Sequence, residues 1–383
     1  MRGMRCVAFS AKLGQWPAQS PVAARVWRLI GLLLAVMVLA GCAETRYYWQ
    51  SVHGHVQLLQ AARPINAWLA DAQTPAALKE RLLLAQRMRN FAVRELALPD
   101  NPSYRRYVQL QRRAVVWNVV AAPAFSLTLK SWCFPVAGCV SYRGYFDEAQ
   151  ARALAAQLQA EGLEVSVYGV PAYSTLGWMN WAGGDPLLST FIHYQEGELA
   201  RMLFHELAHQ VLYVPDDTVF NESFATAVER LGGARGLAAE ASDAVRRDFA
   251  AAELRRRQYR DLTLGARERL RQVYAMPDAA ASPDAALAKT AAMADFRRAY
   301  AELRTSWGGF AGYDQLVANA NNASLGAQGV YEDLVPGFEA LFEREGRNWQ
   351  SFYDAVRRLA EKPAAERSKL LRTTKPATET HGG

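Results

Sequence analysis

Two histidines four residues apart, with a glutamate directly after the first, constrain this chain more than any other feature. His205, Glu206 and His209 lie in residues 196–213, where apolar residues recur at helical spacing. On a helix, both histidines project from one face about one turn apart. Two neutral imidazoles are good Zn²⁺ ligands when a third protein ligand completes the set and one position stays open for water. The spacing therefore predicts a metal-binding helix, with Glu206 placed to accept a proton from that water.

The third ligand is expected a short distance downstream. Residues 221–231 are predicted to form a second helix, and Glu222 lies in its first turn, where the returning chain can approach the two histidines. Glu229, about two turns later on a similar face, is the main alternative ligand. Asp216 and Asp217 have the character of turn and capping residues. Without a metal, the same pattern would describe two histidines hydrogen-bonded in a helical core.

The first 41 residues have the character of an export signal. They carry five basic and no acidic residues, and they end in the short apolar run 29–40. That run is too short for a comfortable membrane span. Leu39-Ala40-Gly41-Cys42 resembles the bacterial lipoprotein lipobox, with cleavage before Cys42 and acylation of that cysteine. Since Ala43 stands where a retention signal would place Asp, we expect a periplasmic protein anchored by lipid to the outer membrane; an ordinary signal peptide or an anchor helix is the alternative.

The basic character of the whole chain comes largely from this leader. Removing five basic residues from the 44 Lys and Arg leaves 39, against 37 Asp and Glu. A mature chain with a net charge of about +2 has no strongly basic surface, so nucleic acid is not an expected partner.

The remaining chain is predicted to be α+β and predominantly helical. Residues 42–233 would hold N-terminal helices, a mixed sheet and the metal-site region; 234–372 would form a helical C-terminal part of the same catalytic unit, and 373–383 a disordered tail. The predicted strands are 113–121, 125–132, 140–145, 163–170 and 187–194.

Two cysteines are predicted to form a disulfide. Apart from Cys42, Cys133 and Cys139 are the only cysteines after the leader, and an exported protein meets an oxidising environment. The alternative, a metal site built on their thiolates, lacks further His or Cys nearby.

Several segments together resemble the family of bacterial predicted zinc aminopeptidases. The resemblance covers most of the mature chain and is carried by residues 47–51 (YYWQS), 171–178 (PAYSTLGW), 185–190 (DPLLST), 205–210 (HELAHQ) and 220–225 (FNESFA). It implies a zinc-dependent peptidase that uses both histidines and a downstream glutamate as ligands, in a zincin-like fold with a mixed sheet above the metal helix.

The resemblance also suggests where peptide and transition state would bind. A strand before the metal helix would edge the cleft, which makes Tyr173, Ser174 and Trp178 candidate cleft residues; aromatic packing of their loop on the core is the alternative. Zinc peptidases commonly use a Tyr or His to hold the oxyanion, and Tyr331 and Tyr313 are the candidates.

The sequence thus predicts a zinc peptidase, and an aminopeptidase in particular, acting on peptides with Glu206 as general base. An aminopeptidase also needs a carboxylate for the substrate ammonium, for which Glu196, Glu198 and Asp185 are candidates. The alternatives are a zinc endopeptidase and a non-catalytic envelope lipoprotein with a structural metal site.

Overall fold

The computed structural model describes residues 46–134, 138–172, 174–240 and 242–373. It divides into two units, 1–52 and 53–383. In the first unit, residues 46–52 are helical. The leader with Cys42, and residues 374–383 of the predicted tail, lie outside the described residues; Thr373 is the last residue of a helix. None of the described helices is both long and apolar enough to cross a membrane.

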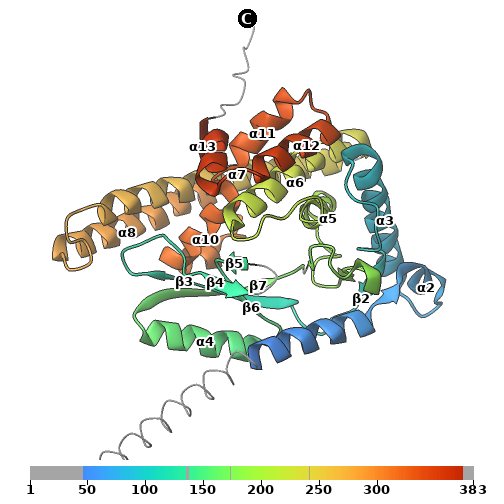
Figure 1. Ribbon diagram of the computed structural model, residues 1–383, viewed down its shortest axis with the longest axis horizontal. Coiled ribbons are helices and arrows are strands. Elements are labelled where there is room, and N and C mark those ends of the chain that lie inside the picture. The colour runs from blue at the N-terminus through green and yellow to red at the C-terminus, as the bar shows by residue number, and fades with distance from the viewer. Residues whose placement is uncertain (1–45, 135–137, 173, 241, 374–383) are drawn as a thin grey trace, which may run out of the picture. The chain divides into compact units, whose positions relative to one another are not determined.

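An antiparallel sheet lies between two helices of the second unit. Its central strand β3 (Val116–Pro123) pairs with β6 (Arg143–Tyr145) and with β7 (Leu163–Val170). Helix α4 (Glu148–Ala160), capped by the side chain of Asp147, packs on one face, and α10 (Asn322–Glu332) packs on the other (Figure 1). Because both faces are covered, β3 is buried along nearly its whole length.

The remaining strands are short, and this corrects the expectation of one mixed sheet. β1 (Arg63–Pro64), β2 (Arg106–Val108) and β8 (Leu187–Leu188) form a separate small mixed sheet. β4 (Trp132–Phe134) and β5 (Gly138–Val140) form a hairpin, and the predicted Cys133–Cys139 disulfide is present in it. Residues 189–194 form turns instead of a strand, since several of their N–H groups bond back to carbonyls three or four residues earlier.

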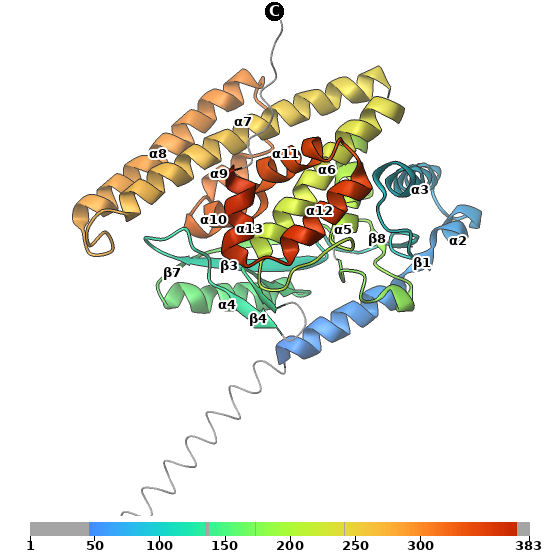
Figure 2. The same ribbon diagram turned by 45° about the horizontal axis from the view of Figure 1, so that its top comes forward.

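The main hydrophobic core surrounds two adjacent helices. α5 (Glu196–Ala208) and α6 (Thr218–Glu240) pack side by side, and α3 (Ala76–Leu96) covers α5. Three C-terminal helices cover this pair from the other side (Figure 2): α11 (Val335–Arg344), α12 (Trp349–Ala360) and α13 (Ala364–Thr373). Helix α5, which carries His205, and helix α6, which carries Glu222, therefore lie at the centre of the largest core.

A second, smaller core lies in a helical arm. The long helices α7 (Asp243–Tyr274) and α8 (Pro283–Ser306) pack along each other, with α9 (Asp314–Ala318) and α10 completing the cluster. Figure 2 shows this pair extending beside α11 and α6. The prediction of a mostly helical C-terminal part is confirmed. The short helix α2 (Ile65–Ala70) precedes α3.

Candidate metal centre

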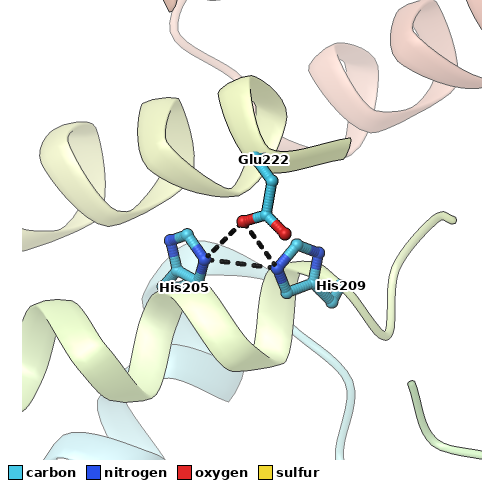
Figure 3. Close-up of side chains that lie close together, drawn as sticks. All are labelled: His205, His209 and Glu222. Carbon is cyan, nitrogen blue, oxygen red and sulfur yellow. Dashed lines mark hydrogen bonds and ion pairs between the residues drawn. The ribbon is translucent and has the colours of Figure 1, made fainter. Parts of the chain in front are cut away.

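His205 of α5, His209 directly after the last residue of that helix, and Glu222 of α6 converge on one point. The Nε2 atoms of His205 and His209 are 3.2 Å apart, and Oε2 of Glu222 lies 3.3 Å from the first and 3.6 Å from the second. All three residues are buried. Figure 3 shows the carboxylate descending from α6 between the two imidazoles.

The loop between the helices is held so that Glu222 returns to the histidines. The side chain of Asn221 accepts from the backbone N–H of Val214 at 2.8 Å and donates to its carbonyl at 2.7 Å. Asp217 accepts from the N–H of Phe220 at the start of α6. Ala225 and Ala227 are fully buried, and their small side chains let neighbouring elements pack closely against α6.

This donor set fits a divalent metal such as zinc. Ligand atoms at the usual Zn–N and Zn–O distances in tetrahedral geometry lie roughly 3.3 Å from one another, which matches the observed separations of 3.2 to 3.6 Å. Among the described residues, these three side chains form the cluster of His, Cys, Asp or Glu that could hold a metal ion. Two imidazoles and one carboxylate would also leave a coordination position open for water.

Glu229, the alternative ligand, lies on the other side of His205. Its Oε2 is 2.9 Å from Nδ1 of His205, and its other oxygen accepts from buried Arg201. Arg201 also donates to Glu253 at 2.5 Å, and Arg256 donates to the same oxygen at 2.6 Å. A carboxylate on Nδ1 fixes the imidazole tautomer that leaves Nε2 free for a metal.

Burial and nearby charges shift the pKa values of these groups. Burial opposes ionisation of Glu222, but the charge of His209 and hydrogen bonds from both histidines overcome it and lower the pKa of Glu222 to about 2. Burial likewise disfavours the charged form of His205, yet its hydrogen bonds to Glu222 and Glu229 raise the pKa of the imidazole well above its usual range. The site therefore attracts positive charge, as a metal site must. Burial raises the pKa of Glu206.

A cavity of about 470 Å³ opens beside this cluster. His205 and Glu206 line it on the side of α5, and Tyr331 of α10 and Tyr168 of β7 line it opposite them. The rings of His205 and Tyr331 are 6.3 Å apart between centroids. A space of this volume accommodates a small molecule or a few residues of a peptide.

A family model described as "Putative aminopeptidase" matches residues 46–371. The chain belongs to this family. Comparison of this chain with curated proteins and with solved structures finds no match. Membership in the aminopeptidase family supports action on peptides, and the buried His-His-Glu cluster could bind a metal.

Of the tyrosines beside this cluster, the sequence predicts Tyr331 but not Tyr168 or Tyr142. Burial raises the pKa of Tyr168 to about 12, while the neighbouring side chains of Asn118 and Tyr331 act in the opposite direction. Burial followed by the charge of Glu222 raises the pKa of Tyr142 and of Tyr331 well above the usual range. Because Tyr142 lies between β5 and β6 and Tyr168 lies in β7, both distant in sequence from α5, no local spacing signals them.

Most of the predicted cleft residues lie away from the cavity. Ser174 bonds to buried Asp185, and Trp178 is 66% exposed without lining the cavity; Tyr173 lies outside the described residues. Tyr313 does line the cavity, stacked on Tyr259 with ring centroids 4.1 Å apart. The candidate ammonium anchors Glu196, Glu198 and Asp185 are not among the lining residues.

Three of the five segments that carry the family resemblance, 171–178, 185–190 and 205–210, meet at the end of α5. Gln210 donates to Ser103 and to Asp185 and accepts from Asn101 at 2.6 Å. Asp185 in turn accepts from the backbone N–H and the hydroxyl of Thr175. These bonds join the loops around residues 101–103 and 174–185 to the metal helix and so hold its C-terminal end.

Proposed function

We propose that the protein is a zinc-dependent peptidase that acts as an aminopeptidase. The observation that carries the proposal is the buried triangle of His205, His209 and Glu222 at the edge of a cavity that Glu206 also lines. Family membership supports the same conclusion independently. Zinc at this site would activate a water molecule and polarise the scissile carbonyl.

The side chains divide the remaining work. The two histidines would hold the metal through Nε2 and Glu222 would hold it through Oε2, the atoms that face one another. Glu206 accepts a proton from the attacking water and returns it to the leaving amine. Burial raises the pKa of Glu206, which brings its proton affinity closer to that needed for transfer in both directions near neutral pH.

Tyrosine hydroxyls supply the stabilisation of negative charge on the substrate carbonyl oxygen. Tyr331 lines the cavity beside His205, and Tyr168 lines it as well. Their raised pKa values keep both hydroxyls protonated, and hence able to donate, throughout the physiological pH range.

A zinc endopeptidase is the second candidate, and one observation favours it. Three of the four carboxylates that line the cavity, Glu229, Glu253 and Glu332, each accept a hydrogen bond from an arginine. The fourth is Glu206, which catalysis requires. The lining residues therefore offer no uncommitted carboxylate to bind a substrate ammonium group.

The proposed location follows from the leader. We propose that the chain is exported, acylated on Cys42 and held at the periplasmic face of the outer membrane. Mass spectrometry of the membrane-extracted protein would detect a diacyl or triacyl mass on Cys42, and a Cys42→Ala variant would be recovered without lipid. Recovery of an unlipidated native protein would contradict this part of the proposal.

The activity is tested with the mature chain, zinc and matched peptides with free or acetylated N-termini. Cleavage of the free peptides only would establish an aminopeptidase, and internal cleavage of the acetylated ones would establish the endopeptidase. Zinc-loaded protein that cleaves neither set, over a panel covering all side-chain classes, would contradict the proposed function.

A further inference from the structure

The cavity is lined by equal numbers of arginines and glutamates, which come from α5 and α6 on one wall and from α7 and α10 on the opposite wall. These are Arg201, Arg230, Arg256 and Arg260, and Glu206, Glu229, Glu253 and Glu332.

The ion pairs among these residues leave one arginine almost uncommitted. Arg230 donates to both oxygens of Glu332 at 2.7 Å. Glu253 accepts from Arg201 and from Arg256, as described above. The strongest hydrogen bonds of these groups are therefore made within the protein.

Arg260 differs from its neighbours. Its Nε is 3.8 Å from Glu332 and 3.7 Å from exposed Asp261, both beyond hydrogen-bond distance, and it also lies in the field of Glu339. Within the described parts of the chain, no hydrogen bond of 3.5 Å or less is donated by its guanidinium group. One turn earlier on α7, Arg256 keeps a buried Nη2 atom without a partner. Residues four apart share a helix face, so two sets of unused donors lie together.

The side chains around Arg260 suit the planar group of a ligand. Tyr259 and Tyr313 are stacked on each other and line the same cavity. The Arg260 side chain is 26% exposed, so a ligand can reach it while much of the surrounding water is excluded. A guanidinium group binds a carboxylate in a bidentate manner, and such charge-assisted bonds are stronger than neutral ones.

We propose that Arg260 binds a carboxylate of the substrate, so that acidic peptides are the preferred substrate class. The inference rests on the proposed peptidase function and deepens it. The carboxylate is either an acidic side chain next to the scissile bond or the C-terminal carboxylate of a short peptide. Both sources present the same chemistry to Arg260.

Binding is measured on a Glu206→Gln background, which prevents turnover, by calorimetry with and without added zinc. The probes are Ala-Glu amide and Glu-Ala amide against Ala-Gln amide and Gln-Ala amide, with Ala-Gln bearing a free C-terminus as the second arm. We expect the probes with one of the two carboxylates, the acidic side chain or the free C-terminus, to bind at least about tenfold more tightly than the matching amide without it. The pair of probes that shows this difference identifies which carboxylate Arg260 binds.

Variants of α7 assign the preference to Arg260. Arg260→Gln should abolish it, and Arg260→Lys, which keeps the charge but loses the planar fork, should retain part of it. Arg257→Gln is the matched control, since Arg257 is exposed on the same helix and does not line the cavity. Equal binding of acidic and neutral probes, or a preference that survives in Arg260→Gln, would overturn the inference.

Turnover by the wild-type chain separates this inference from the proposed function. If zinc-loaded protein cleaves neutral peptides as well as acidic ones, the peptidase stands and the substrate preference falls. If it cleaves nothing but still binds the acidic probes through Arg260, the carboxylate site stands and the peptidase falls.

Discussion

The two walls of the cavity are built in different ways. On the wall formed by α5 and α6, His205, His209 and Glu222 lie at short sequence spacings inside the main core, and Nδ1 of His205 is paired with Glu229. On the opposite wall, α7 contributes the partly buried Arg256 and Arg260 together with Tyr259 of the second core, and α10 contributes Tyr331. The first wall is thus assembled by short sequence spacings, whereas the second is assembled by packing between distant segments.

The largest expected effect lies on the first wall, in Glu206→Gln. The amide cannot accept the proton of the attacking water, so kcat should fall by about 10²- to 10⁴-fold, while zinc content stays stoichiometric because Glu206 is outside the ligand cluster. Steady-state kinetics on the best peptide and metal analysis of the same sample check this. A variant with wild-type kcat would remove Glu206 from the mechanism.

A smaller effect should follow from Glu229→Gln, which weakens the hydrogen bond to Nδ1 of His205 and leaves His205, His209 and Glu222 in place. We expect zinc affinity to fall by about 10- to 100-fold, measured by competition with a chromophoric chelator. Glu253→Gln is the matched control, since Glu253 also accepts from Arg201 but does not touch a histidine. Equal losses in both variants would show that the ion-pair network acts only through folding.

The smallest effect on chemistry should come from Gly329→Ala, where α10 contacts α7. A Cβ at this position would overlap the guanidinium of Arg267, which is 4% exposed and pairs with Asp333 at 2.9 Å. We expect a loss of about 1–3 kcal/mol in unfolding free energy from overpacking, with the zinc content unchanged. Chemical denaturation of the zinc-loaded protein measures it; Gly265→Ala on the same arm, where a Cβ meets open space, is the control. Loss of zinc in Gly329→Ala would show that the two walls are not independent.

The sequence predicted the first wall well and the second wall poorly, for a physical reason. The spacing of His205 and His209 fixes their relative position as soon as a helix forms, and Glu222 needs only one short loop to reach them. The boundaries of β7 could likewise be predicted from the local apolar pattern. Tyr168, Tyr142 and Arg260 reach the site through contacts between distant segments, which no local pattern encodes.

The expected strands also show where local pattern fails. Residues 125–132 carry several apolar side chains, but only Trp132 of this range is in a strand, because β3 already pairs with β6 on one side and with β7 on the other. Residues 187–194 form two strand residues followed by turns, because Ser189 bonds to Leu110 and the chain then leads into α5. In both places tertiary pairing decides the outcome.

Metal content of the mature chain tests the central claim most directly. Mass spectrometry should find one zinc per chain in wild type and in His193→Ala, an exposed histidine close to the same helix, and much less than one in His209→Ala and in Glu222→Ala. Folding of each variant is checked by circular dichroism. Stoichiometric zinc in His209→Ala, or no zinc in wild type after reconstitution, would contradict the account.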